Sequence, residues 1–299
     1  MVKVVQCVPN FSEGTDLEKV AKISEVFKQK AGVTLMGCEP DKDYNRTVIT
    51  VLGEPEAVAE AVIEAIGVAT EIIDMNVQKG EHPRMGATDV VPFIPIKNMK
   101  MEECVELSKK VAQEVNKRYG IPIFLYENSA SAPNRISLPD IRKGQFEGMA
   151  EKLLLPEWGP DYGDRKIHPT AGVTAIGGRM PLIAYNINLN TQNVEIAKKI
   201  AAAIRFSSGG FRFIQAGPAE IKEKGFVQVT MNIKDYKKNP IYRVFEAVKM
   251  EARRYGINII GSEIIGALPM DAVTESLEYY IGLDHGSTVD KVIETELLK

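Results

Sequence analysis

The chain of 299 residues is 44% hydrophobic and carries a formal net charge of −3, so it can build one large or two modest domains around apolar cores. The slightly negative charge, without a basic run of interleaved aromatic residues, argues against nucleic-acid binding. The sequence has no run of about 18 apolar residues, which argues against a membrane span. Cys7, Cys38 and Cys104 show neither CxxC spacing nor an even count, which predicts a reducing, cytoplasmic environment.

The first half of the chain alternates strand-like apolar runs with amphipathic helical patterns. An apolar run at residues 2–8 predicts a strand, and a Thr15-x-x-Glu18 capping box introduces a helical pattern that Gly32 ends. The further elements expected in this half are strands at 33–38 and 47–52, a helix at 55–73, a strand at 89–95, a helix at 104–119 and a strand at 121–126.

The pattern weakens between Glu127 and Gly172, where proline and glycine punctuate the sequence. A long irregular connection of this kind is usually a functional or a linking segment. Gly177-Gly178 then predicts a hairpin turn between two apolar runs, at 173–176 and 181–189. The remaining expected elements are a helix at 197–204, strands near 211–215 and 225–232, a helix at 241–255 and a strand at 257–260.

A weak internal repeat suggests a two-part architecture. Residues 117–123 resemble residues 253–259, and each segment ends a helix with glycine and begins a strand. Helix–Gly–strand junctions are common, so chance is an alternative explanation. Together with the βαββαβ order of each half, the repeat favours an α+β protein of two ferredoxin-like subdomains, residues 1–180 and 181–299. We expect each subdomain to be a mainly antiparallel sheet with helices on one face.

The loop before the strand at 89–95 is the best candidate for chemistry. It places His82 two residues from Arg84 and seven from Asp89, with Gly80 and Gly86 on either side. The unperturbed pKa of a histidine, about 6.5, suits proton transfer at neutral pH. The alternative is an ordinary surface-loop histidine.

The sequence lacks the common motifs of other enzyme classes. It contains no HExxH and no Cys/His cluster at ligand spacing, so we expect no metal. It also contains no P-loop, no GxGxxG and no serine nucleophile elbow. A histidine-centred site therefore favours acid/base or group-transfer chemistry. Three other polar clusters, at 10–13, 39–46 and 161–179, are open to interpretation as plain solvated loops.

Several segments, taken in order from residue 4 to about residue 270, form a more specific pattern. They are Cys7–Gly14 (CVPNFSEG), Asn45–Val48 (NRTV), Gly80–Ala87 (GEHPRMGA) with Asp89, Pro92–Pro95 (PFIP), Ala184–Leu189 (AYNINL) and Gly261–Gly266 (GSEIIG). Together they resemble the formiminotransferase family, the domain of glutamate formimidoyltransferases and of formimidoyltransferase-cyclodeaminases. Any one of these segments alone would be a weak signal.

The resemblance implies an activity in histidine degradation and one-carbon metabolism. A formimino group would pass between N-formimino-L-glutamate and N5 of tetrahydrofolate, so tetrahydrofolate is a co-substrate and no metal takes part. Family members form homodimers of two ferredoxin-like subdomains. The cyclodeaminase half has no counterpart in this sequence, so the product would be released or passed to a separate cyclodeaminase.

The resemblance also assigns residues. It implies His82 as general acid/base, assisted by Glu39, where an aspartate is usual. We group Arg84 with these catalytic candidates as an arginine that would bind a substrate carboxylate. A carboxylate such as Glu39 or Asp89 would fix the imidazole tautomer and raise its pKa, and arginines would bind the anionic substrates. The expected folate- and glutamate-binding residues are Asn10, Asn45, Arg46, Asp89, Gly163, Asp164, Arg165, Lys166, Ile167, His168, Pro169, Thr170, Ala171, Gly172, Arg179, Asn186 and Asn188.

Two alternatives stay open. One is a related folate enzyme that acts on 5-formyltetrahydrofolate or N-formylglutamate, because the residues do not separate a C=NH donor from a C=O donor. The other is a non-catalytic folate-binding protein, which is hard to reconcile with an intact loop of His82, Arg84 and Asp89.

Overall fold

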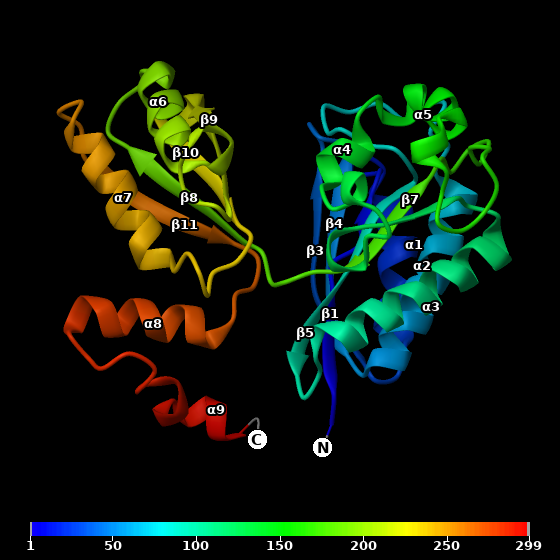
Figure 1. Ribbon diagram of the computed structural model, residues 1–299, viewed down its shortest axis with the longest axis horizontal. Helices are drawn as coiled ribbons and strands as arrows, with labels where there is room; N and C mark the ends of the chain where they lie inside the picture. Colours follow the sequence, from blue (N-terminus) through cyan, green and yellow to red (C-terminus); the bar gives the residue numbers. More distant parts are fainter. Residues whose placement is uncertain (1, 298–299) are drawn as a thin grey trace. The chain divides into compact units, whose positions relative to one another are not determined.

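The computed structural model describes residues 2–297, and the chain divides into two compact units, residues 1–179 (the N-terminal unit) and residues 180–299 (the C-terminal unit). Each unit has its own sheet (Figure 1). Each also has its own apolar core. The fold is α+β, as predicted, with one mixed and one antiparallel sheet. Within the described part of the chain, none of the helices combines the length and apolar character that crossing a membrane requires.

The sheet of the N-terminal unit is mixed. Its strands are β1 Val4–Cys7, β2 Asn10–Phe11, β3 Val33–Asp41, β4 Arg46–Gly53, β5 Thr88–Lys97, β6 Ile123–Leu125 and β7 Thr174–Gly178. β4 pairs with β3 on one side, and β1 and β2 lie between β4 and β5, all antiparallel. β7 and β6 extend the sheet beyond β5 as parallel strands. These two strands make the sheet mixed where we expected a mainly antiparallel one.

Helices cover both faces of this sheet around β5. The unit contains α1 Leu17–Gln29, α2 Pro55–Ile72, α3 Met101–Tyr119, α4 Leu138–Arg142 and α5 Gln145–Leu154. Val91 and Phe93 of β5 pack into the core that α1, α2 and α3 share, whereas Val90 packs with Ile141 of α4 and Met149 of α5. The expectation of helices on one face is therefore wrong for this unit. β5 is apolar on both faces, so helices pack against each of them.

The predicted hairpin at Gly177-Gly178 is also wrong. Both glycines lie inside β7, which pairs with β5 and β6, while the following strand belongs to the sheet of the C-terminal unit. A Cβ on Gly177 would lie 2.2 Å from the carbonyl oxygen of Tyr126. The glycine thus permits close backbone approach between neighbouring segments and does not mark a turn.

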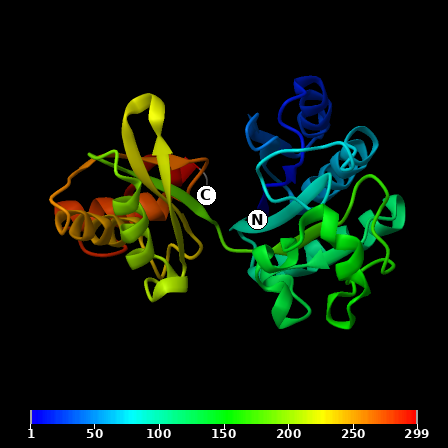
Figure 2. The ribbon, with the colours of Figure 1, turned by 90° about the horizontal axis from the view of Figure 1, so that it is seen from above.

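The C-terminal unit has a four-stranded antiparallel sheet in the order β11-β8-β10-β9. Its elements are β8 Ile183–Leu189, α6 Val194–Ile204, β9 Ile214–Ile221, β10 Phe226–Ile233, α7 Ile241–Arg253, β11 Ile259–Ile265, α8 Met270–Ile281 and α9 Ile293–Leu297. The β9–β10 hairpin is the yellow pair of strands in Figure 2. Alternate residues of β8, among them Tyr185 and Ile187, pack with α6 and α7, which leaves Asn186 and Asn188 on the opposite face.

Candidate functional site

The turn between β3 and β4 fixes the loop that carries His82. Asn45 sits in this turn with a φ of +45°, a left-handed conformation that asparagine tolerates better than most residues. Its Oδ1 accepts a hydrogen bond from the Gly14 amide at 2.8 Å, and its Nδ2 donates to the Lys79 carbonyl at 2.7 Å. One side chain therefore ties the turn to both the segment before α1 and the loop before β5.

The loop packs tightly against this turn at Gly80. A Cβ on Gly80 would lie 2.3 Å from the carbonyl oxygen of Tyr44 and 2.7 Å from Cβ of Asn45. The Tyr44 ring meets the His82 imidazole edge-on, with their centroids 6.2 Å apart. The backbone around residue 80 and the Tyr44 ring together position His82.

Arg84 holds a different part of the unit against the same loop. Its side chain is only 8% exposed. Its guanidinium donates to Gln78 Oε1 at 3.0 Å, to Gln145 Oε1 at 3.1 Å and to both oxygens of Glu147 at 2.9 and 2.7 Å. Its carbonyl accepts from the Phe146 amide at 2.9 Å. These contacts fasten the start of α5 to the His82 loop, so the geometry favours a positioning role for Arg84.

Asp89 is committed to neighbouring protein groups. The residue is 1% exposed, and its Oδ1 accepts from the Met85 amide at 2.9 Å. Its Oδ2 accepts from Nε of Arg142 at 2.8 Å and also from Nη2 of the same guanidinium. Sequence reasoning missed Arg142, which ends the five-residue helix α4 inside the weakly patterned segment.

His82 lies among positive charges. Burial, and then the charges of Arg46 and Arg142, lower the pKa of His82 to about 3. We expected a neighbouring carboxylate, Glu39 or Asp89, to raise this pKa. That expectation is wrong for the free protein, because burial and the two arginines dominate and Asp89 is paired with Arg142. The imidazole is therefore neutral at physiological pH and able to accept a proton.

The side chain of Arg46 has fewer hydrogen-bond partners than that of Arg142 among the described residues. Its guanidinium carbon lies 5.7 Å from the centroid of the Tyr44 ring. Burial and the charge of Arg142 lower its pKa. Its Nε is buried and, among the described residues, has no hydrogen-bond partner.

Glu39 and Asn10 lie on one face of the sheet. The register pairs Glu39 with Val48 of β4, and Val48 in turn with Asn10 of β2. The Glu39 side chain is exposed and makes no hydrogen bond or ion pair with the residues that the structure describes. Asn10 donates from Nδ2 to the carbonyl of Val8 at 3.0 Å.

The end of the 163–172 segment is tied to the end of the His82 loop, just before β5. His168 and Gly172 exchange two backbone hydrogen bonds of 3.1 Å, and Nδ1 of His168 accepts from the Ala171 amide at 2.9 Å. The Ala87 amide donates to the Ala171 carbonyl at 2.9 Å. A Cβ on Gly172 would lie 2.3 Å from the carbonyl oxygen of Met85, so the two segments meet in backbone contact.

The other expected residues of this region differ in their surroundings. Arg165 donates to the carbonyls of Leu155 and Pro156 at 2.9 and 3.1 Å, and so caps the end of α5. The carbonyls of Pro169 and Thr170 accept from Asn76 Nδ2 and the Met75 amide. The exposed residues of the segment include Gly163, Asp164 and Lys166. Ile167 packs against the apolar cluster to which α5 contributes. The Arg179 amide donates to the carbonyl of Phe93.

Asn186 and Asn188 belong to a polar network in the C-terminal unit. Nε2 of Gln228 donates to Asn188 Oδ1 and to Glu263 Oε1, each at 2.8 Å. Nδ2 of Asn186 donates to the same Glu263 oxygen at 3.2 Å. The hydrogen bonds from Asn186 and Gln228 lower the pKa of the Glu263 carboxyl.

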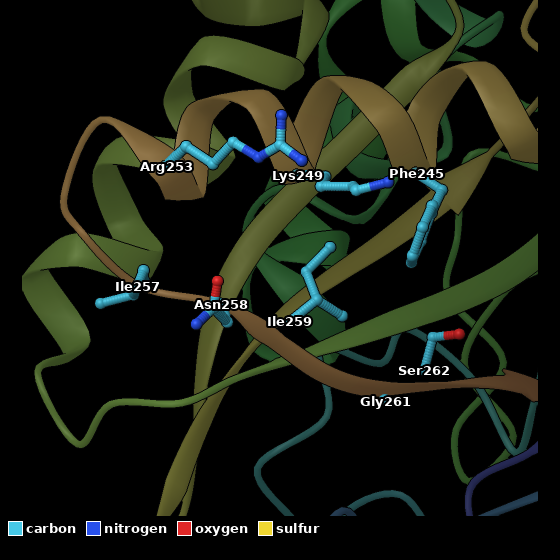
Figure 3. A pocket seen from close by; sticks show the side chains of 8 residues that line it. All are labelled: Phe245, Lys249, Arg253, Ile257, Asn258, Ile259, Gly261 and Ser262. Atoms are coloured by element: carbon cyan, nitrogen blue, oxygen red, sulfur yellow. The ribbon is translucent and has the colours of Figure 1, made fainter.

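The C-terminal unit also contains a hollow of about 460 Å³ between α7 and β11. Figure 3 shows Phe245, Lys249 and Arg253 extending from α7 on one side, with Ile259 and Ser262 on the other. Nζ of Lys249 pairs with Glu246 at 3.0 Å. The expected site residues do not line this hollow.

Comparisons with known proteins identify the class of protein to which this chain belongs. The formiminotransferase domain, N-terminal subdomain, matches residues 4–179, and the formiminotransferase domain matches residues 184–297. The chain therefore belongs to the formiminotransferase family.

Curated relatives give a more particular likeness. The chain is 50% identical over 298 residues to glutamate formimidoyltransferase of Streptococcus pyogenes serotype M1, covering 100% of both chains. It is 41% identical to glutamate formimidoyltransferase of Thermoplasma acidophilum, covering 98% of both chains. It is 39% identical to formimidoyltransferase-cyclodeaminase of Dictyostelium discoideum, covering 99% of this chain and 56% of that relative.

Proposed function

We propose that this protein transfers a formimino group between N-formimino-L-glutamate and N5 of tetrahydrofolate, with His82 as the general acid/base. One observation carries the proposal: a neutral, half-buried imidazole lies in a fixed loop beside Arg46 and Arg142. The chain that holds it is 50% identical, over its whole length, to a glutamate formimidoyltransferase. The reaction needs both a proton acceptor and cations that hold anionic substrates, and this site supplies both.

His82 has two tasks in this reaction. N5 of tetrahydrofolate is the nucleophile, and its bond to the formimino carbon gives a tetrahedral intermediate. Collapse of this intermediate breaks the carbon–nitrogen bond to glutamate. Neutral His82 accepts the proton that N5 loses and delivers it to the departing glutamate nitrogen, so protons balance over the transfer. General acid–base catalysis of this kind typically contributes about 10²–10⁴-fold.

We assign the remaining residues by what surrounds them. Arg84 positions the loop, and Asp89 fixes Arg142. Glu39 is exposed on β3, so it is the carboxylate left to assist His82 in the complex. We assign folate and glutamate binding to the other expected residues, namely Asn10, Asn45, Arg46, Gly163 to Gly172, Arg179, Asn186 and Asn188, whereas Asp89, expected among them, is committed to Arg142. The contact of Gly172 with Met85 and Gly86 of the His82 loop supports a folate site in that segment.

We also propose the finer architecture and setting of the protein. The strand order β11-β8-β10-β9, and the order β3-β4-β1-β5 within the larger sheet, support a ferredoxin-like subdomain in each unit, divided at residue 180. We propose a homodimer in the cytoplasm, whose product is released or passed to a separate cyclodeaminase. Light scattering of the purified protein would test the dimer.

A steady-state assay of the purified full chain tests the activity. Tetrahydrofolate would be supplied with N-formimino-L-glutamate or N-formyl-L-glutamate, and wild type compared with His82→Ala. His285→Ala is the matched control, because that imidazole is 77% exposed and belongs to the C-terminal unit. We expect turnover with the formimino donor that only His82→Ala abolishes. Turnover with the formyl donor alone would favour a formyl-transferring folate enzyme, and folate binding without turnover a non-catalytic protein.

A further inference from the structure

We propose that Arg46 and Arg142 form a carboxylate-binding subsite beside His82, and that a bound carboxylate is what makes His82 an effective base. This inference rests on the proposed function and names the ligand class that the site selects, a donor with a free carboxylate. Sequence reasoning offered Arg46 as a carboxylate ligand; Arg142, and the coupling to His82, come from the structure.

The guanidinium of Arg46 has a buried N–H group without a hydrogen-bond acceptor among the described residues. Its Nε is buried without a hydrogen-bond partner in the described part of the chain, and it makes no ion pair there. Buried polar groups are normally satisfied, so an exception calls for an explanation such as a missing ligand. A carboxylate is the acceptor that a guanidinium binds best, because two parallel N–H groups match its two oxygens.

Arg142 is held in a fixed orientation by neighbouring groups. Asp89 accepts from Nε and Nη2 of Arg142, which leaves Nη1 outside that pair. Nζ of Lys152 donates to the carbonyls of Asp140, Ile141 and Lys143 and so fixes the end of α4. The guanidinium is therefore oriented before any ligand arrives, which lowers the entropy cost of binding.

The charges around His82 favour an anion. The groups that face it are Arg46 from β4, Arg142 from α4 and the Tyr44 ring from the intervening turn. The carboxylate of Asp89 is the partner of Arg142, and the charges of Asp41 and Asp89 act on Arg46 in the direction that raises its pKa. These carboxylates leave a net positive field at the imidazole, because the two arginines still lower its pKa.

A carboxylate bound between the arginines would offset this field. The pKa of His82 would then rise from about 3 towards its ordinary value, and the imidazole would become a stronger base only with substrate present. By linkage, protonation of His82 would in turn tighten carboxylate binding by the same factor. The free protein would thus hold a weak base, and the complex an effective one.

The test is an NMR titration of the full chain. The imidazole Cε1–H signals of the three histidines would be followed, and His82→Asn assigns the signal of His82. Glutarate is the probe, and glutaramide, which has the same length without charge, is its control. We expect His82 to stay neutral down to about pH 4.5 alone and to titrate at least one pH unit higher with saturating glutarate. Glutaramide should leave it unchanged, and the His168 signal should not respond to either probe.

Variants of the two arginines complete the test. Arg142→Gln should weaken glutarate binding at least tenfold and remove the glutarate-dependent change, and Asp89→Asn with Arg142→Gln avoids an unpaired buried carboxylate if the single variant is unstable. Arg46→Gln leaves no buried carboxylate without its partner, and it should likewise weaken glutarate binding and remove the glutarate-dependent change. A glutarate effect that is absent, or equal in all variants, would overturn the proposal. Transfer activity without the coupling would refute this inference alone, whereas coupling without transfer would refute the proposed function alone.

Discussion

Replacement of Asn45 probes how the fold fixes His82. Its two shorter side-chain hydrogen bonds, 2.8 Å from the Gly14 amide and 2.7 Å to the Lys79 carbonyl, contribute about 1 kcal/mol each. Its φ of +45° costs an alanine roughly 1 kcal/mol more, whereas glycine adopts it freely. We therefore expect Asn45→Ala to lower the free energy of unfolding by about 3 kcal/mol and Asn45→Gly by about 2 kcal/mol.

Urea denaturation measures this directly. Trp158 is the only tryptophan and lies in the N-terminal unit, so its fluorescence reports the unit that contains Asn45. The catalytic consequence should follow the stability change, because a loosened Lys79 frees the loop that carries His82. If both variants unfold within about 0.5 kcal/mol of wild type, or if the alanine variant is the more stable one, this account of the turn is incorrect.

Three further predictions concern the same loop. Arg84→Met should lower the free energy of unfolding by about 2–4 kcal/mol, because it removes a buried guanidinium with four side-chain acceptor contacts. Glu147→Gln, at a 64% exposed side chain, should lower it by less than about 1 kcal/mol. Equal losses of stability in denaturation curves would mean that the pair is only a surface ion pair. Gly80→Ala should cost about 1–3 kcal/mol by overpacking, against a neutral or slightly stabilising Gly148→Ala, where a Cβ meets nothing within 4 Å. The pKa of His82 is about 3 in the folded protein and near 6.5 when unfolded, so the unfolded chain takes up the proton first and stability falls as pH drops below about 6.5. His82→Asn removes this loss and should gain roughly 1–2 kcal/mol relative to wild type between pH 8 and pH 5; a pH-independent difference would contradict the assigned pKa.

The local elements could be predicted because their periodicity is strong. The helices at 17–29 and 241–253 and the alternating strand at 183–189 follow from apolar spacing alone. α4 has only five residues, too few for a helical period to appear, so the position of Arg142 could not be predicted. The buried run of β5 indicated a strand but not that both of its faces would be covered.

The sequence predicted the loop at the centre of the candidate site, but not the residues with which its side chains pair. His82, Arg84 and Asp89 are close in sequence, which marked the loop. The groups that decide their roles come from far along the chain: Arg142 lies 53 residues from Asp89, and Glu147 lies 63 residues from Arg84. A sequence shows that charged residues are present. The burial of His82, its position near Arg46 and Arg142, and the pairing of Asp89 with Arg142 depend on tertiary packing.

The most direct test of the central claim follows the transferred carbon itself. N-formimino-L-glutamate labelled with ¹³C at the formimino carbon would be mixed with tetrahydrofolate and protein, and the label followed by ¹³C NMR. The account predicts that the label moves from glutamate nitrogen to folate nitrogen with wild type, and that His82→Asn, which keeps the polarity but cannot exchange a proton, leaves it on glutamate. Label that stays on glutamate with folded, folate-binding wild-type protein would contradict the proposed activity, and undiminished transfer by His82→Asn would contradict the role of His82.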